Sequence, residues 1–490
     1  MPSTRPIPFP TIRQPGRWLA VLLLSGPAAA IAQTSPAVST IVAFSNSQPT
    51  SAPVRGPDGA LYGTTSTATS ITGGLIYRAE LDGRSVVTLH QLSVNEGYSP
   101  VGGLVLGSDG RLYGTTSIGA LTEVNMPGTV FSIRPDGSEF RILHRFQTFS
   151  STNQAGTAVN DEGANPETEL IEVGPDGFLY GITRAGGTNG TGVIFKIAKD
   201  GSGFKVIHTF EKITSASGAI PLQNNEGFGS VSPLVEVVEG ADRYLYGTAA
   251  DGGPNGNGTV FRLRHDGSEF SEFTVVHAFT ALGTAAGSTL LTNDDGATPL
   301  AGLTAVTVEG EPRPRLYGVT NLGGQFGNGT LFRLNADGGG VTAVHHFDGA
   351  GGARPTGELL LAESGGLGGE ITLYGTTATG TNAGATATTG GTIYSFGLGD
   401  TGFTSLLSLD GAHGSTPTGR LIELNGSTFV GVAQGGGRCG QGTLFQFSLT
   451  GDTINGNTNC GRSDSGSGST APGLLLLLGA LGLVRRRRQA

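Results

Sequence analysis

A tripeptide, Leu-Tyr-Gly, recurs along this chain and constrains its fold more than any other feature. Six intact copies begin at residues 61, 112, 179, 245, 316 and 373, and a seventh, altered copy reads Phe429-Val430-Gly431. Neighbouring copies lie 51 to 71 residues apart. A repeat of this length indicates an array of similar units, in which each unit covers the apolar face of the next. We therefore expect one large repetitive domain within the 490 residues.

Each unit contains four strand-like segments in a fixed order. A Pro precedes a short apolar segment, Leu-Tyr-Gly forms the second segment, and Gly-Thr-aliphatic-aromatic, as in Gly128 to Phe131, forms the third. An Asp-Gly pair, as at Asp136-Gly137, then precedes the fourth segment, which reads Leu143 to Phe146 in the same unit. Asp-Gly between apolar runs favours a hairpin, because Gly adopts the positive φ that the turn requires. Each unit is therefore predicted to be a four-stranded antiparallel meander.

The two ends of the array predict that it closes into a ring. The seventh unit has three strands, the last of them ending at Leu449, and the residues that follow do not resemble a strand. Thr40 to Phe44 has the pattern of a fourth strand, such as Val276 to Phe279, and lies just before Pro49 of the first unit. We predict an all-β, seven-bladed β-propeller of four-stranded antiparallel blades, closed by the N-terminal strand 40–44, which completes the last blade.

Residues 1–32 have the features of a secretory signal peptide. A basic front precedes the apolar run Leu19 to Leu24, and Ala30 to Ala32 is a small-x-small site, so cleavage is expected between Ala32 and Gln33. A retained membrane anchor is the alternative, which the short run, interrupted by Gly26-Pro27, disfavours. The propeller is then assigned to residues 33–450, in the exported part of the protein.

A second apolar segment lies at the other end of the chain. Residues 451–470 form a Gly/Ser/Asn-rich spacer, and residues 471–490 form a short apolar run that ends in Arg485 to Arg488. The run is shorter than the roughly 20 residues of a spanning helix, and the arginines favour the cytoplasmic side. We predict a sorting or anchoring segment at the inner membrane, either cleaved or retained as a tail anchor.

The charge of the predicted mature body restricts its partners. The formal charge of −9 becomes about −16 when the seven arginines of the two ends are taken away. Such an acidic body disfavours nucleic acid and anionic lipid, and favours cations or cationic ligands. Membrane contact is expected only through the C-terminal segment, and the protein is expected to be a monomer.

Two cysteines, Cys439 and Cys460, occur late in the chain. In an oxidising compartment they are candidates for a disulfide that ties the spacer to the last repeat. Two free thiols, or a Cys460 that belongs to the sorting signal, are the alternatives.

The repeat motifs together carry a resemblance to a known family. Leu-Tyr-Gly-Thr-Thr, the Gly-Gly loop, Gly-Thr-Val-Phe, Asp-Gly and Leu-His-x-Phe resemble the GloVer-type tandem repeat of choice-of-anchor bacterial surface proteins over residues 40 to 449. The tail resembles a GlyGly-CTERM sorting signal, although its spacer reads Ser-Gly-Ser-Gly-Ser. The resemblance implies a cell-surface or secreted propeller that the export and C-terminal sorting machinery handles, and it implies no catalytic residues.

An acidic residue followed by Gly precedes six of the seven first strands. These residues are Glu96, Glu162, Glu226, Asp295, Asp348 and Asp410. Because the first strands of a propeller line its channel, the carboxylates are candidates for a ring at the channel mouth that binds Ca²⁺ or a cationic ligand. The alternative, which their local repetition favours, is that each carboxylate caps its own turn. No other cofactor is predicted.

The recurrent histidines are interpreted as packing residues. They occupy one position of the outer strand in five blades, at residues 90, 144, 208, 277 and 345, too far apart around the rim to converge on an ion. His413 lies in a link beside Asp410 and is the one weak candidate for catalysis. The sequence contains no nucleophile elbow, no phosphate-binding loop and no metal-type His or Cys spacing.

Two functions of different classes are consistent with these features, and a purely structural envelope component is a third alternative. The first is a non-enzymatic binding module that recognises a carbohydrate, a peptide or an envelope protein with its loop face. The second is an extracellular hydrolase or lyase that acts on a polysaccharide or another polymer. Long links near residues 147–163, 211–227 and 280–296 crowd one side of that face, where function is usually found. The fold alone does not decide between the two.

Overall fold

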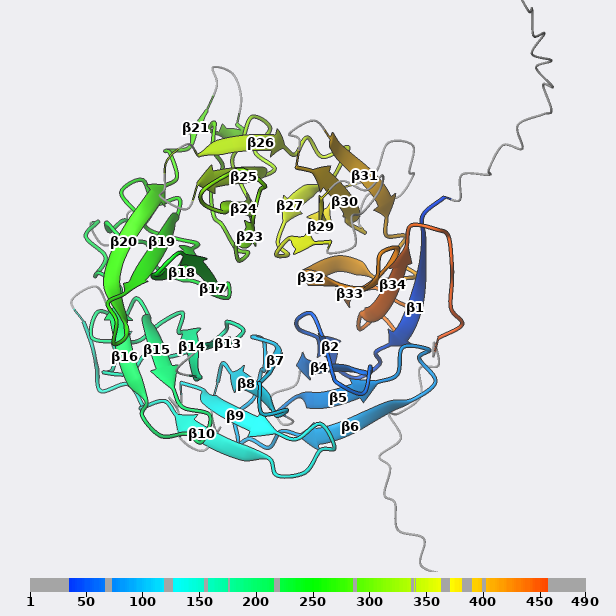
Figure 1. Ribbon diagram of the computed structural model, residues 1–490, viewed down its shortest axis with the longest axis horizontal. Helices are drawn as coiled ribbons and strands as arrows, with labels where there is room; N and C mark the ends of the chain where they lie inside the picture. Colours follow the sequence, from blue (N-terminus) through cyan, green and yellow to red (C-terminus); the bar gives the residue numbers. More distant parts are fainter. Residues whose placement is uncertain are drawn as a thin grey trace, which may run out of the picture.

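A computed structural model describes residues 35–66, 73–118, 127–153, 157–174, 177–215, 221–284, 289–335, 339, 341–362, 371–380, 390–398 and 402–456. Within these ranges the strands form seven sheets of four or five strands around a central axis (Figure 1). The predicted all-β, seven-bladed propeller is confirmed. No helix in the described ranges is long and apolar enough to cross a membrane. The predicted signal peptide and C-terminal segment lie outside the described residues and stay predictions.

The first four blades follow the chain from the channel outward. Blade one contains β2 (Gln48–Pro49), β3 (Val54–Arg55), β4 (Leu61–Ser66), β5 (Leu75–Ala79) and β6 (Val86–Gln91). Blade two contains β7 (Leu104–Leu106), β8 (Leu112–Thr116), β9 (Thr129–Ile133) and β10 (Arg141–Arg145). Blade three contains β13 (Ile171–Val173), β14 (Phe178–Ile182), β15 (Val193–Ile197) and β16 (Lys205–Thr209). Blade four contains β17 (Val235–Glu239), β18 (Asp242–Ala249), β19 (Thr259–His265) and β20 (Phe270–Ala278).

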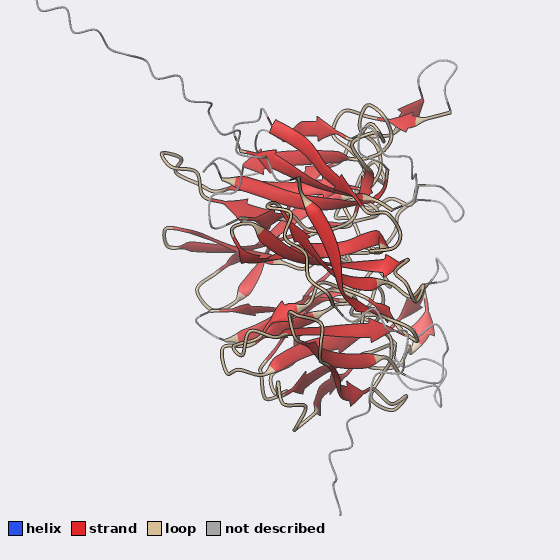
Figure 2. Cartoon of the chain, turned by 90° about the vertical axis from the view of Figure 1, so that its right-hand side faces the viewer, coloured by secondary structure: helices blue, strands red, loops and turns tan. Residues whose placement is uncertain are grey.

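The remaining blades complete the circle. Blade five contains β23 (Thr304–Val306), β24 (Arg315–Thr320), β25 (Thr330–Asn335) and β26 (Thr342–His346). Blade six contains β27 (Ala353–Pro355), β28 (Leu360–Leu361), β29 (Thr372–Thr379), β30 (Thr392–Gly397) and β31 (Gly402–Ser408). Blade seven contains β32 (Ser415–Asn425), β33 (Thr428–Gly435), β34 (Thr443–Ser448) and the N-terminal β1 (Ala37–Ala43). Figure 2 shows the ring edge-on, with the strands running across its thickness and loops on both faces.

Two of the long links carry small hairpins of their own. One pairs β11 (Ser151–Thr152) with β12 (Ala158–Val159), and the other pairs β21 (Gly283–Thr284) with β22 (Leu291–Thr292). The side chain of Asn153 donates a hydrogen bond to the carbonyl oxygen of Asn189, in the loop between β14 and β15. This link therefore packs against the second loop of the next blade, on the loop face.

The N-terminal strand closes the ring as predicted. β1 pairs antiparallel with β34, with Thr40 opposite Phe445 and Val42 opposite Leu444 (Figure 1). Ile41 is fully buried in an apolar cluster that also contains Val430 of blade seven and Leu61 of blade one. One strand thus supplies both the last strand of the final sheet and part of the seam between the final and first blades.

The glycine of Leu-Tyr-Gly provides space for an aromatic ring. Gly114 stands opposite Phe131 of the neighbouring strand, and a Cβ atom on Gly114 would lie 2.6 Å from the Cζ atom of Phe131. Gly181 and Phe195 have the same relation at 2.6 Å. The recurrent glycine and the aromatic residue of the third strand are therefore two halves of one packing arrangement.

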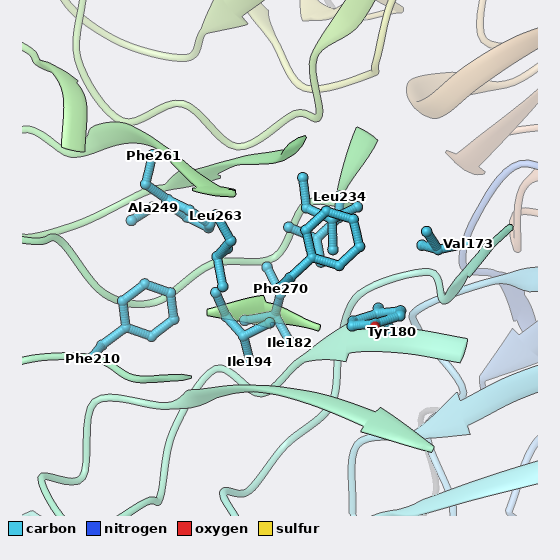
Figure 3. Close-up of a cluster of buried hydrophobic side chains, with 11 residues drawn as sticks. Val173, Tyr180, Ile182, Ile194, Phe210, Leu234, Ala249, Phe261, Leu263 and Phe270 are labelled. Atoms are coloured by element: carbon cyan, nitrogen blue, oxygen red, sulfur yellow. The ribbon is translucent and has the colours of Figure 1, made fainter. Parts of the chain in front are cut away.

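The hydrophobic core is divided among the seams between blades. Seven clusters of buried side chains each combine residues of two adjacent blades, around the whole ring. Between blades three and four, Tyr180 and Ile194 pack with Leu234 and Phe261 (Figure 3). Each seam depends on its neighbours, because an uncovered blade would expose its apolar face to water.

The outer-strand histidines join one blade to the next. The ring of His144 in blade two stacks on Phe204 of blade three, with centroids 3.8 Å apart. The equivalent pairs are His90–Phe140, His208–Phe273 and His345–Phe403. These histidines have packing roles at the rim of the ring.

Removal of side-chain volume from the closing strand is expected to destabilise the whole ring. We expect Ile41→Ala to lower the free energy of unfolding by about 2–5 kcal/mol, because it leaves a cavity at the seam between the last and first blades. Urea unfolding measures the change. Val87→Ala is the matched control, since Val87 is 39% exposed and its truncation is expected to change stability by about 0.5 kcal/mol or less. Equal effects of the two truncations would contradict this role of β1.

His345 is expected to make stability depend on pH. Its Nε2 is buried without a hydrogen-bond partner in the described structure, and burial lowers the pKa of His345 from 6.5 to about 4. As the pH falls from 6.5 towards 4, the unfolded chain takes up a proton that the folded protein does not, so stability is lost, on the order of 2 kcal/mol.

His345→Phe keeps a ring against Phe403 and removes the titrating group. Unfolding free energies at pH 7 and pH 5 are expected to differ less in this variant than in the wild-type protein. An equally steep loss of stability in both proteins would show that His345 does not contribute to it.

Candidate binding site in the central channel

One repeat position near the start of the innermost strand is shared by all seven blades and lies beside the channel. The strand register defines it, because each first strand has a residue opposite the Tyr of Leu-Tyr-Gly, such as Ile171 opposite Tyr180. The position two residues earlier is occupied, in blade order, by Ala52, Gly103, Glu169, Pro233, Gly302, Glu358 and Arg420. Four blades thus place a small or apolar residue there, and three place a charged one.

The three charged residues meet although they come from different blades. Arg420 Nη2 lies 3.5 Å from Glu169 Oε1, a long ion pair between blades seven and three. Glu358 of blade six has no hydrogen bond or ion pair at such distances among the described residues. The side chains of Arg420 and Glu169 are 39% and 19% exposed, so they face water while protein surrounds them.

Three cavities converge on these side chains. One of about 440 Å³ extends towards the loop face, where Ser99, Ser117 and Glu167 line it. One of about 740 Å³ extends towards the opposite face, and its lining includes Ser108, Glu172 and Lys199. A third of about 650 Å³ lies among blades one, six and seven. Glu358 and Arg420 line all three cavities, and Glu169 lines the first two.

The surroundings of the two carboxyl groups alter their proton affinity. Burial raises the pKa of Glu358 to about 7, with Arg420 acting against the shift and Glu169 adding to it. Burial also raises the pKa of Glu169, against the opposing effect of Arg420. The charge of Glu169 raises the pKa of Arg420, which stays protonated. Near neutral pH, Glu358 therefore exchanges between acid and carboxylate beside a permanent cation.

A second group of charges lies on the loop-face side of the constriction. Arg184 Nη1 is 3.4 Å from Glu167 Oε2. Burial raises the pKa of both Glu167 and Asp251, and the charge of Arg184 opposes both shifts. Two carboxyl groups again surround one cation, so this approach to the constriction is acidic.

The six predicted acidic residues lie elsewhere. Four of them contact the histidine of the preceding outer strand: Glu96 with His90 at 3.2 Å, Glu162 with His144 at 3.1 Å, Glu226 with His208 at 3.0 Å and Asp295 with His277 at 3.0 Å. All six accept a backbone N–H group. For Glu96, Asp348 and Asp410 the donor lies two or three residues away in the same turn, and for Glu162, Glu226 and Asp295 it lies 15 residues earlier, at the start of the long link. None lines the three cavities.

The expected ring of carboxylates at the channel mouth is therefore absent from the described structure. Glu96, Asp348 and Asp410 cap their own turns, whereas Glu162, Glu226 and Asp295 each hold the two ends of a long link together. Their side chains turn towards the rim because the nearest hydrogen-bond donors are the rim histidines and the backbone of the links. No three His, Cys, Asp or Glu side chains in the described ranges are close enough together to hold a metal ion.

The other predicted residues have local surroundings. His413 Nδ1 lies 2.9 Å from Asp410 Oδ1, and the same oxygen accepts the backbone N–H of His413. The carbonyl oxygen of His413 accepts a hydrogen bond from Thr443, so this residue fastens the link between blades six and seven. Cys439 is disulfide-bonded, and its predicted partner Cys460 lies outside the described residues.

The residues of the constriction were missed at the sequence level, although a signal for them exists. Residues 166–170 read Pro-Glu-Thr-Glu-Leu, residues 355–359 read Pro-Thr-Gly-Glu-Leu and residues 417–421 read Pro-Thr-Gly-Arg-Leu. Residues 100–104 and 299–303 have Gly at the same place, as Pro-Val-Gly-Gly-Leu and Pro-Leu-Ala-Gly-Leu. Alignment of the first strands therefore reveals charges where the repeat uses a small residue.

The comparison with family models identifies the repeat. The Gloeobacter/Verrucomicrobia repeat matches residues 29–231 and 292–476, which is most of the chain. The chain belongs to this repeat family. The resemblance that the repeat motifs carry is thereby confirmed, and the sorting signal stays a prediction.

Solved structures to which this chain is similar include a β-propeller domain. The propeller domain of the Trilobed protease from Pyrococcus furiosus is 10% identical, with a TM-score of 0.40 over 83% of this chain and 98% of that one. Oligogalacturonate lyase in complex with manganese is 9% identical, with a TM-score of 0.46 over 85% and 94%. A putative 6-phosphogluconolactonase from Bacteroides uniformis is 16% identical, with a TM-score of 0.44 over 76% and 88%. These likenesses concern the fold alone. No curated protein matches the chain in sequence.

Replacement of the Glu358 carboxyl group is expected to stabilise the protein at alkaline pH. The pKa of Glu358 is about 7 in the folded state and 4.5 in its ordinary state, so the stability that its proton contributes is lost as the pH rises from 4.5 through 7. Glu358→Gln removes this loss, and at pH 8 we expect a gain on the order of 2 kcal/mol in urea unfolding.

The titration itself can be followed by carbon NMR of labelled glutamate carboxyl groups. A resonance that titrates near pH 7 is expected in the wild-type protein and is expected to disappear in Glu358→Gln. Glu169→Gln is expected to lower the pKa of Glu358, because it removes a neighbouring negative charge. A Glu358 carboxyl group that titrates near its ordinary pKa would contradict this description of the constriction.

Proposed function

We propose that this chain is an exported, non-enzymatic binding protein that holds a small polar ligand in its central channel, at Glu169, Glu358 and Arg420. The observation that carries the proposal is the charged residue at one repeat position in three of the seven blades. The other blades show that the fold tolerates a small residue there. The charges are therefore not a requirement of the scaffold.

The energetics of the constriction support a binding role. An enclosed carboxyl group without a hydrogen-bond donor opposes folding, and Glu358 is in that position. Proteins retain such local conflicts mainly at functional sites. The cavities also have the usual composition of a ligand site, with a few convergent polar groups among half-buried aliphatic residues such as Ile171, Val235 and Leu360.

Export is part of the same proposal. The signal-like residues 1–32, the apolar residues 471–490 and the acidic body support a location at the cell surface or in the medium. A small extracellular carbohydrate or peptide would then reach the channel from either face, because cavities open on both sides of the constriction.

A second candidate function is hydrolysis, and the difference between the two carboxyl groups favours it. Glu358, with a pKa of about 7, would donate a proton, and Glu169, whose carboxyl group is paired with Arg420, would act as the base. Two carboxyl groups in unlike environments are the usual acid and base of such reactions. Cavities of about 440 and 740 Å³ lie on the two sides of the pair.

Calorimetry with defined probes tests the binding proposal. L-lysine, triglycine, cellotetraose and trigalacturonate are titrated into the intact protein, and at least one is expected to bind. Glu169→Gln and Glu358→Gln are expected to weaken that binding by about tenfold or more, as loss of a charged contact does. Glu272→Gln, a carboxylate on the exposed outer strand of blade four, is the matched control and is expected to bind like the wild-type protein.

The same samples distinguish the two functions. Mass spectrometry after prolonged incubation is expected to show intact probes. Release of shorter products that Glu358→Gln abolishes would replace the binding function by hydrolysis. Absence of binding and of turnover with all four probes, or equal affinities of channel variants and wild type, would overturn the assignment of the site to the channel.

A further inference from the structure

We infer that the ligand of the channel carries a single protonated amino group, which the Glu358 carboxylate binds beside the Glu169–Arg420 ion pair. The inference rests on the proposed binding function and specifies its ligand class. It follows from the number and pairing of the charges at the constriction, where two carboxyl groups face one guanidinium.

The charges at the constriction sum to one negative charge when both carboxyl groups are ionised, so one additional cation would neutralise them. Arg420 is 3.5 Å from Glu169, and these two charges compensate each other. Glu358 lines all three cavities and has no hydrogen bond or ion pair of its own among the described residues. When Glu358 is ionised, the constriction therefore carries one uncompensated negative charge. An organic monocation supplies the missing charge, and an anion would be repelled.

The charged groups around the constriction do not supply that cation. On the loop-face side, Arg184 is engaged by Glu167, and Asp251 adds a further carboxyl group. On the opposite side, Lys199 Nζ lies 2.5 Å from Glu172 Oε1.

In the third cavity, Arg55 is exposed, and its guanidinium donates to the carbonyl oxygen of Leu424. Apart from Arg420, the cations that line the cavities are thus engaged elsewhere. The loop-face side and the opposite side of the constriction each carry at least as many carboxyl groups as cations. An ammonium ion that enters from either side therefore meets no net positive charge.

The walls favour an amine on an aliphatic chain. The half-buried residues Val105, Ile171, Val235 and Leu360 line the cavities that meet at Glu358. Methylene groups of a ligand would lie against these side chains while its ammonium group donates hydrogen bonds to the carboxylate. A neutral polyol would instead bind Glu358 as an acid and would not require its ionisation.

Binding of an amine near neutral pH releases a proton. In the free protein part of Glu358 is protonated, and the neighbouring ammonium ion stabilises the carboxylate. The protonated carboxyl group and the ammonium ion therefore give an ion pair and one free proton, with no other change in bonding. Proton release distinguishes this mode from the binding of a neutral molecule.

Calorimetry at pH 7 in phosphate and in Tris, which differ in heat of ionisation, measures both affinity and proton release. The probes are n-butylammonium chloride and 1-butanol, which have similar chains and differ in charge. We expect the amine to bind and release a fraction of a proton, and the alcohol to bind at least tenfold more weakly. Glu358→Gln is expected to weaken amine binding by about tenfold or more and to abolish proton release, and Glu272→Gln is expected to change neither.

A second variant changes the preferred charge of the ligand. Arg420→Gln leaves both carboxylates without their cation, so a dication should fit the altered constriction. The ratio of the affinities for putrescine and n-butylammonium is expected to rise about tenfold in this variant. Circular dichroism and thermal unfolding establish that each variant keeps the fold, and Glu358→Gln is expected to be at least as stable as the wild type.

The outcomes separate the two proposals. Binding of cellotetraose that depends on Glu358 and releases no proton, with no binding of the amine, would overturn the ligand class and leave the channel as the binding site. Absence of binding by every probe, charged or neutral, would overturn both. Amine binding that Glu358→Gln and Arg420→Gln leave unchanged would overturn the assignment to this constriction.

Discussion

Seven apolar faces arranged in a circle have to cover one another, and the last can be covered only by the first. The pairing of β1 with β34 meets this requirement, and Ile41 reaches the seam with blade one. The rest of the structure depends on this closure. A closed ring fixes the distance of every innermost strand from the axis, so equivalent positions of seven blades face one narrow channel. Residues far apart in sequence, such as Glu169 and Arg420, meet there.

Side chains of the repeat scaffold are paired with one another, whereas a side chain at the constriction is not. In the scaffold, recurrent residues have complements within the repeat array, as Gly114 has in Phe131 and His144 in Glu162. At the constriction the blades differ from one another, and Glu358 has no such complement among the described residues. A carboxyl group in that condition opposes folding at neutral pH and is available to a ligand. Glu358, which departs from the repeat, is thus the residue whose charge a ligand would compensate.

Sequence patterns predicted the fold because each contribution to it is local. The Asp-Gly turns, the alternation within strands and the strand-like residues 40–44 are read within one unit or at the chain ends. The acidic residues of the links were harder to interpret. Glu162 and Asp295 stand just before strands that lead to the channel, yet their side chains contact histidines at the rim. The direction of a side chain in a link depends on which donors lie nearest, and sequence order does not give that information.

The sequence by itself determined the number of blades, the order of their strands and the closure of the ring, because hydrophobic pattern and turn chemistry specify antiparallel units one at a time. Only the tertiary structure decided which charges share a site. Glu169 and Arg420 are 251 positions apart, and the local sequence of neither residue indicates that the other is its partner. Their meeting with Glu358, and the raised pKa of its carboxyl group, arise from the convergence of blades three, six and seven around an enclosed channel. The local sequence does not specify that convergence, because the convergence is a property of the closed ring.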